Sequence, residues 1–218
     1  MNHNDIDLFL EEGEGFQVEF KRKVSSPEKI ARTLVAFANT KGGTIIFGVD
    51  DDKSVVGIDS EKAEMELIRD AGTLFCDPVI DPVVDIVPYK GMDVIVVTVE
   101  ESAEKPHFLV DGNGGSEEES KAMIRVNDKT LIASKEVVKI LESENPDSAP
   151  LRIVIGDHER RLLEYLERNE RITVKELSKL INISLRRASR ILIGLVRAGL
   201  LRIHTNEREE FYTKAFDS

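Results

Sequence analysis

The sequence predicts an α+β protein with two domains, and three observations lead to this prediction. Within the first 143 residues, segments whose apolar residues alternate with polar ones are interleaved with segments of helical periodicity. From residue 155 onward, three helical patterns end in two short strand patterns. A polar stretch with two prolines, Glu142–Pro150, lies between these regions. We therefore expect domains at 1–143 and 155–214, joined by a linker at 144–154.

The composition is that of a globular chain kept in a reducing compartment. Of the 218 residues, 41% are hydrophobic, which is enough to bury a core. The single cysteine, Cys76, cannot form an intramolecular disulfide, so we expect a buried thiol and a cytoplasmic location. No apolar run approaches the roughly 20 residues that a membrane-spanning helix needs. Since the first residues are polar and acidic, we expect neither secretion nor membrane insertion.

Charge is distributed unevenly along the chain, whose net charge is −11. Residues 152–214 carry 14 Lys and Arg against 9 Asp and Glu, a net charge of +5. Residues 1–151 carry 16 against 31, a net charge of −15. A basic module joined to an acidic body is the pattern expected for a DNA-binding domain fused to a regulatory domain. The acidity of the body argues against DNA binding by that part.

The segment FQVEFKRK, Phe16–Lys23, predicts the first strand. Its three apolar residues occupy alternate positions, so they share one face of the strand. Glu19 and Lys21 then point together from the opposite, polar face.

A helix and a second strand follow. Ser26 is the predicted N-cap of the helix, with a proline directly after it. Lys41-Gly42-Gly43 ends the helix, and we expect Asn39 to bond locally in this turn. The apolar run Thr44–Val49 predicts a strand, which ends in three aspartates, Asp50–Asp52. The turn is not a P-loop, because its lysine precedes the glycines and a strand follows them.

Further strands and helices are predicted in the N-terminal domain. A glycine at position 91 marks the turn of a β-hairpin. The glycine-rich, acidic segment Asp111–Ser120 predicts a loop. The remaining predicted elements are a helix or arm within residues 1–12, strands at Val55–Ile58, Val83–Val87, Val94–Val99 and Met123–Val126, and helices from Ser60 and over Ser134–Leu141.

The order E-F-K, helix, A-F-A-N-T-K-G-G, apolar strand, G-V-D-D resembles the Schlafen-type AlbA-like domain. That family is also catalogued among the DNA-binding or divergent ATP-binding domains of prokaryotic regulators. The resemblance runs from about Glu14 to Leu141, since IRVNDKT and the helix after it are similar to the closing strand and helix of that domain. It implies an α/β sandwich that serves assembly or signal sensing.

An acidic cluster in this domain is the candidate site of a metal-dependent nuclease. Relatives with nuclease activity carry two glutamates five positions apart, as Glu14 and Glu19 are, and an acid near the G-V-D-D turn, where Asp50 and Asp51 lie. Glu14, Glu19 and Asp51 would hold Mg²⁺ or Mn²⁺, with Lys21 as the cation beside the scissile phosphate. The structural alternative is a surface pair of Glu19 with Lys21 and a turn whose aspartates accept backbone amides.

Three helices and a hairpin are predicted in the C-terminal region. Thr173 caps the second helix and Ser184 the third, and only Asn182, Ile183 and Ser184 separate the two. Gly199 ends the third helix, after which two short strands follow. This order resembles a winged helix-turn-helix, with ISLRRASRILIGLVRAGLLR as recognition helix and entry to the wing.

Basic side chains of the third helix are the candidate DNA contacts. An inward stripe of Ala188, Leu192, Leu195 and Val196 leaves the polar residues of the N-terminal half outside. Arginine there can bind guanine or phosphate, whereas a solvated face or a dimerisation surface is the alternative. The predicted DNA-binding residues are Arg186, Arg187, Ser189 and Arg190, with Lys175, Arg202 and Arg208 at backbone phosphates.

These observations predict a cytoplasmic prokaryotic transcriptional regulator that binds double-stranded DNA. One recognition helix covers a half-site, so at least a homodimer is expected. The effector is not identified by the sequence. A metal-dependent RNase, with Mg²⁺ or Mn²⁺ as its cofactor, and a protein-interaction scaffold are the alternatives; otherwise no cofactor is expected.

Overall fold

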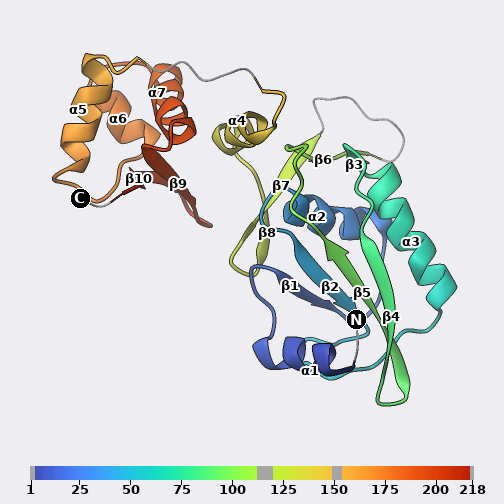
Figure 1. The fold of residues 1–218 in the computed structure, drawn as a ribbon. Helices are drawn as coiled ribbons and strands as arrows, with labels where there is room; N and C mark the ends of the chain where they lie inside the picture. The colour runs from blue at the N-terminus through green and yellow to red at the C-terminus, as the bar shows by residue number, and fades with distance from the viewer. Residues whose placement is uncertain (1–2, 112–119, 149–153, 217–218) are drawn as a thin grey trace. The chain divides into compact units, whose positions relative to one another are not determined.

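The computed structural model describes residues 3–111, 120–148 and 154–216, which form two compact units, Met1–Ala133 and Ser134–Ser218 (Figure 1). The helix that we assigned from sequence to the end of the N-terminal domain, α4 (Lys135–Glu144), groups with the second unit. The domain division predicted at 144–154 stays a prediction, since residues 149–153 lie outside the described range. No helix in the described ranges has the length and apolarity needed to cross a bilayer.

A four-stranded mixed sheet is the centre of the first unit. Its strands lie in the order β1 (Val18–Lys21), β2 (Gly43–Phe47), β5 (Met92–Val99) and β4 (Val83–Tyr89). β1 and β2 are parallel because α2 (Pro27–Ala38) connects them, whereas β2, β5 and β4 pair antiparallel. The predicted hairpin is therefore confirmed as β4 and β5.

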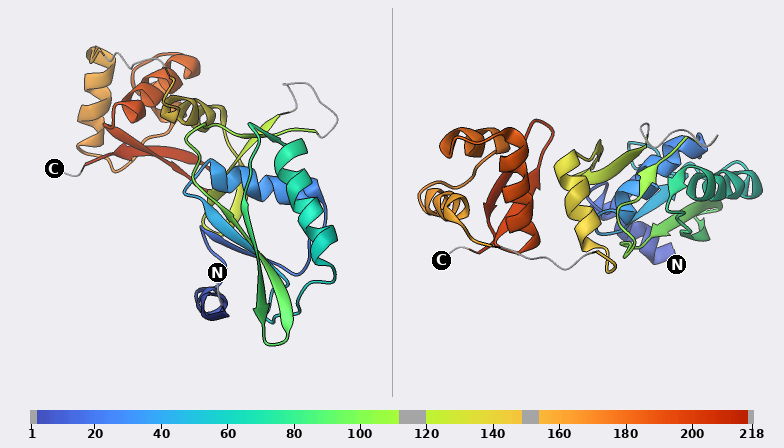
Figure 2. Two further views of the ribbon diagram at one scale, coloured as in Figure 1. Left: turned by 45° about the vertical axis from the view of Figure 1, so that its right-hand side comes forward. Right: turned by 90° about the horizontal axis from the view of Figure 1, so that it is seen from above.

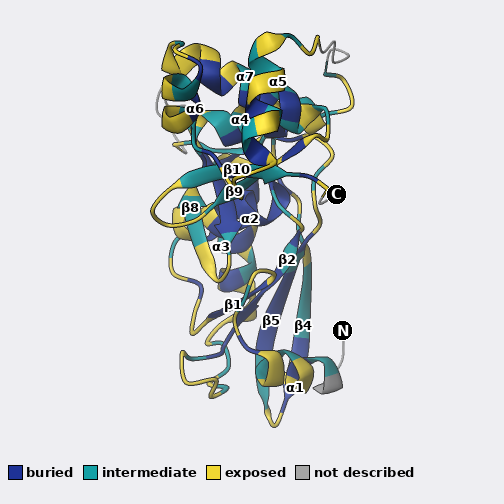
Figure 3. Cartoon of the chain, turned by 90° about the vertical axis from the view of Figure 1, so that its left-hand side faces the viewer, coloured by how far each residue is buried: buried dark blue, intermediate teal, exposed yellow. Residues whose placement is uncertain are grey.

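Helices cover both faces of this sheet. α2 and α3 (Glu61–Leu74) pack on one face over Ile45 and Phe47. α1 (His3–Glu12) packs on the other through Ile6, beside Val18, Phe20 and Ile46. Figure 3 shows β5 largely in the dark blue of buried residues, whereas the edge strand β4 is mostly teal, the colour of intermediate exposure.

The alternation predicted for the first strand is present, but its polar face is not exposed. Val18 and Phe20 are buried as expected, whereas Phe16 precedes β1 and is 39% exposed. Glu19 points to the opposite face and is also buried, because α2 lies over it. The period-2 pattern locates the two faces of a strand, but it does not show what covers each face.

A second sheet lies on the other side of α2. It has the order β3 (Cys76–Asp77), β6 (Phe108–Leu109), β7 (Lys121–Val126) and β8 (Lys129–Ile132). β7 packs against α2, so that helix is buried on two sides (Figure 2). This explains why its second half, residues 34–38, is a continuous apolar run. The loop predicted at Asp111–Ser120 falls largely on residues 112–119, which lie outside the described range. The strand predicted at Val55–Ile58 is wrong, because only Val55 pairs, in an isolated bridge with Val49.

Cys76 confirms the expectation of a buried thiol. It is 4% exposed at the start of β3, and burial raises its pKa to about 12. The thiol donates a hydrogen bond to the carbonyl oxygen of Ala71 at 3.3 Å.

Asn39 joins the end of α2 to the second sheet. Its side-chain amide donates to the carbonyl oxygens of His107 (2.8 Å) and Met123 (3.0 Å) and accepts from the backbone N–H of His107 (2.7 Å). Asn39 is 1% exposed. The expected local bond of the Asn39 side chain is therefore wrong, because the amide bonds to backbone groups of His107 and Met123, which are distant in sequence.

The substitution Asn39→Asp should destabilise the first unit by about 3 kcal/mol, because a carboxylate cannot donate to the two buried carbonyl oxygens. Urea unfolding followed by circular dichroism measures this loss. Asn127→Asp, at an exposed turn position with φ 56°, is the matched control and should change stability by less than about 0.5 kcal/mol. Equal stability of the two variants would show that Asn39 does not join the sheet to the helix.

The second unit contains three helices that pack against a β-hairpin. Besides α4, its elements are α5 (Asp157–Leu166), α6 (Val174–Leu180), α7 (Leu185–Arg197), β9 (Leu201–Thr205) and β10 (Glu210–Lys214). The core contains Leu162, Leu177, Leu192 and Leu195 from the helices and Tyr212 from the hairpin. The predicted order of three helices followed by two strands is confirmed.

Candidate nucleic-acid interface

A tight turn between α6 and α7 sets where the third helix begins. Thr173 and Glu176 form a capping box at the start of α6, with Glu176 Oε2 accepting from Thr173 N at 2.7 Å. Asn182 adopts φ 54° in the turn, a left-handed conformation that asparagine tolerates. Ser184 then caps α7 by accepting from the backbone N–H of Arg187. The two helices are thus joined as in a helix-turn-helix.

The two sides of α7 differ in polarity. Ala188, Leu192 and Leu195 are at most 1% exposed and face the core of the second unit, while Val196 is half-buried against it. Arg186, Arg187 and Arg190 are exposed in the N-terminal half. No ion pair in the described part of the chain engages these three arginines. Their guanidinium groups are available to an anion.

Ser189 differs from the other residues predicted to contact DNA. It is 6% exposed, and its hydroxyl donates to Glu136 Oε1 of α4 at 2.7 Å. Ile193, one turn further along the same side of α7, is 7% exposed. In this arrangement α4 covers that flank of α7, so the Ser189 hydroxyl is not available to DNA.

The remaining predicted contacts lie on α6 and on the hairpin. Lys175 is exposed in the first turn of α6, Arg202 on β9, and Arg208 in the turn between β9 and β10. In that turn Asn206 Oδ1 accepts from the backbone N–H groups of Arg208 and Glu209 at 2.9 Å. These basic side chains all face solvent, as contacts to phosphate require.

The start of α4 bonds to the hairpin, a contact that the sequence did not reveal. The Ser134 hydroxyl donates to Glu210 Oε2 at 2.9 Å. Burial raises the pKa of Glu210, and repulsion by Glu136 adds to this rise, while the bond from Ser134 opposes it. Ile193 was a signal only for the packing of α4 on α7, because it is an apolar residue on the outer side of an arginine-rich helix.

The structure brings together part of the acidic cluster that the sequence predicted in the first unit. Glu14, Glu19 and Lys21 line one cavity of about 530 Å³. Lys21 Nζ lies 2.5 Å from Glu19 Oε1, and Arg125 Nη1 lies 2.5 Å from Glu19 Oε2. Thr33 also donates to Glu19 Oε1 at 3.2 Å. The surface pair expected between Glu19 and Lys21 is therefore part of a larger, mostly buried network that the sequence did not reveal.

The same cavity gathers positive charge inside an acidic domain. Lys29 and Arg32 of α2 line it together with Lys21 and Arg125, against the three carboxylates of Glu14, Glu19 and Asp128. The lining thus carries four cationic against three anionic side chains, although residues 1–151 as a whole are strongly acidic.

Comparisons with known proteins agree with this architecture. Residues 14–134 match the family model described as Schlafen, AlbA_2, which covers more than half of the chain. The chain belongs to the Schlafen AlbA_2 family. Residues 157–202 match a second model, described as winged helix-turn-helix DNA-binding. The comparison with curated proteins found no match.

Two solved structures are similar to this Schlafen AlbA_2 protein. The DIP2311 protein from Corynebacterium diphtheriae is 18% identical, with a TM-score of 0.45, over 70% of this chain and 29% of that one. The N-terminal domain of a RecG-related protein from Nitrosomonas europaea is 20% identical, with a TM-score of 0.44, over 72% of this chain and 97% of that one.

The Schlafen AlbA_2 domain does not assemble the predicted metal ligands. Among the described residues, no three His, Cys, Asp or Glu side chains lie close enough to hold an ion. β1 and β2 are parallel with Glu19 opposite Ile45, so Asp50 and Asp51 follow beyond the end of β2. Asp50 instead pairs with Arg22 at 2.5 Å. Since basic groups also occupy both oxygens of Glu19, the set of Glu14, Glu19 and Asp51 does not fit Mg²⁺ or Mn²⁺ as arranged here.

The substitution Glu210→Gln should raise the unfolding temperature of the second unit at pH 7. The pKa of Glu210 is higher in the folded state than in the unfolded state, so the ionised carboxylate opposes folding. The stability of the unaltered protein therefore falls as the pH rises from the unfolded-state pKa to the folded-state pKa. The gain should vanish below about pH 4, where both states bind the proton. Glu170→Gln, at an exposed carboxylate, is the control in thermal melts across this range. An equal rise in unfolding temperature in both variants would contradict the conclusion that burial of the Glu210 carboxylate destabilises the second unit.

Proposed function

We propose that this protein is a cytoplasmic prokaryotic transcriptional regulator that binds duplex DNA through α7. The single observation that supports the proposal is that Arg186, Arg187 and Arg190 are exposed on the outer surface of α7 and that no ion pair among the described residues engages them. In a winged helix-turn-helix this side enters the major groove, where arginine binds guanine O6 and N7 or phosphate.

The other parts of the second unit support the same surface. Lys175, Arg202 and Arg208 supply exposed positive charge on α6 and the hairpin, at positions suited to backbone phosphates. Ser189 is left out of the proposed contacts, because its hydroxyl is bonded to Glu136.

The Schlafen AlbA_2 domain is proposed to serve assembly or sensing, and the working form to be a homodimer. One recognition helix reads only a half-site, so useful specificity needs two copies. The metal-dependent nuclease is not proposed, because the carboxylates do not form the required ligand set. Cleavage of structured RNA with Mn²⁺ that is lost in Glu19→Gln would overturn this choice.

Simultaneous replacement of Arg186, Arg187 and Arg190 by alanine should weaken duplex binding strongly. If all three contact phosphate, the slope of log affinity against log salt should become less steep by up to about 3. Fluorescence anisotropy with a pool of random-sequence duplexes between about 50 and 200 mM salt measures both the affinity and the slope.

The matched control replaces three other arginines of the same unit, Arg160, Arg161 and Arg168, which are exposed on or just after α5. It removes the same charge from a different surface, so the salt slope should change little. Undiminished binding by the α7 variant, or equal losses in both variants, would overturn the assignment of α7 as the DNA-reading helix.

Homodimerisation predicts a DNA footprint with two-fold symmetry. Duplexes selected from a random pool should contain two half-sites whose centres lie about 10 base pairs, or a multiple of this distance, apart. A selected site with a single unrepeated element would contradict the dimer.

A further inference from the structure

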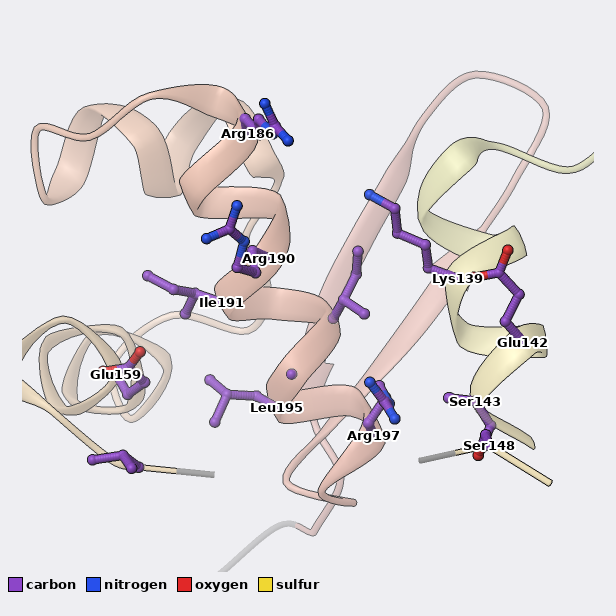
Figure 4. Close-up of a pocket in the computed structure, with 13 residues that line it drawn as sticks. Lys139, Glu142, Ser143, Ser148, Glu159, Arg186, Arg190, Ile191, Leu195 and Arg197 are labelled. Carbon is purple, nitrogen blue, oxygen red and sulfur yellow. The ribbon is translucent and has the colours of Figure 1, made fainter. Parts of the chain in front are cut away.

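A cavity of about 690 Å³ lies along α7 within the second unit, a size typical of small-molecule sites. α7 contributes one wall, while Lys139 and Glu142 of α4 and Glu159 of α5 line other parts (Figure 4). The cavity exists because α4 docks on the flank of α7 through the bond from Ser189 to Glu136.

The lining combines positive charge with an apolar surface. Arg186, Arg190 and Arg197 from α7 and Lys139 from α4 supply four cationic groups. The apolar part is formed by Ile191, Ile193 and Leu195.

Two carboxylates oppose these cations, and one of them is already engaged. Glu159 Oε2 accepts from the backbone N–H of Gly156 at 3.0 Å, in the cap of α5. Glu142 is exposed on α4. Positive groups therefore outnumber negative ones in the cavity by four to two. An anionic head beside an apolar body matches this combination of groups.

We propose that this cavity binds a small organic anion with an apolar body, and that the bound anion competes with DNA for Arg186 and Arg190. The competition rests on the proposed function, since these two arginines line the cavity and belong to the proposed DNA contacts. An anion that neutralises them removes two of the charges available to phosphate, so ligand and DNA exclude each other.

The probe for this site is anilinonaphthalene sulfonate, a fluorescent dye that carries one anionic group on an apolar ring system. Titration of the full chain should give saturable binding at one site per chain. Adding duplex DNA should displace the dye. Binding that does not saturate, or dye that stays bound at saturating DNA, would overturn the proposal.

Three single variants separate the two surfaces. Lys139→Ala removes a cavity cation of α4 that is not among the proposed DNA contacts, so dye affinity should fall about tenfold while DNA affinity is unchanged. Lys135→Ala, at an exposed lysine of the same helix outside the cavity lining, should leave dye affinity within about twofold. Arg187→Ala should weaken DNA binding but not dye binding, since Arg187 does not line the cavity.

The outcomes distinguish failure of the site from failure of the proposed function. If Lys139→Ala and Lys135→Ala bind the dye equally, the cavity is not the binding site, whatever the DNA result. If Arg187→Ala binds DNA as the unaltered chain does while Lys139→Ala loses the dye, the site stands and the DNA assignment fails. Thermal melts of each variant establish that a loss of binding does not reflect unfolding.

Discussion

The inward packing of Ala188, Leu192 and Leu195 is the constraint on which the functional surface depends. These side chains are fully or almost fully buried, and a helix that buries one stripe must present its other residues outward at 3.6 residues per turn. Arg186 and Arg190 are therefore exposed as a consequence of core packing. The caps at Thr173 and Ser184 add to this by setting where α6 and α7 begin.

The acidic cluster of the first unit has a different physical basis. Glu19 and Arg125 form an ion pair that is almost fully excluded from water. Such a pair adds little net stability, because desolvation offsets the attraction, but loss of one partner leaves a buried charge and is costly. The pair also joins β1 to β7, and hence the two sheets on either side of α2. These contacts give Glu19 a structural role, which explains why a glutamate is buried at this position.

Contacts with α4 reduce the exposed surface of α7, the helix proposed to read DNA. A basic helix predicted to face solvent along its outer side is covered on one flank, where Ser189 and Ile193 lie. The exposed surface is therefore narrower than the sequence suggests and centres on the arginines. The same docking forms the cavity beside them, so the proposed DNA-binding surface and a ligand-sized space share side chains.

The sequence by itself determined most of the helices and strands of this protein and the inward and outward sides of α7, because hydrophobic period, caps and turn residues act over a few positions. It missed the two-residue strands β3 and β6, and the strand that it predicted at Val55–Ile58 is only a single bridge. The family resemblance added the order of the elements in the first domain. Only the tertiary structure decided the partners of the buried polar groups. Glu19 meets Arg125 across 106 residues, Asn39 meets Met123 across 84, and Ser189 meets Glu136 across 53. Polar side chains carry no period that reveals such distant partners, and the parallel register that separates Asp50 from Glu19 exists only once the sheet has formed.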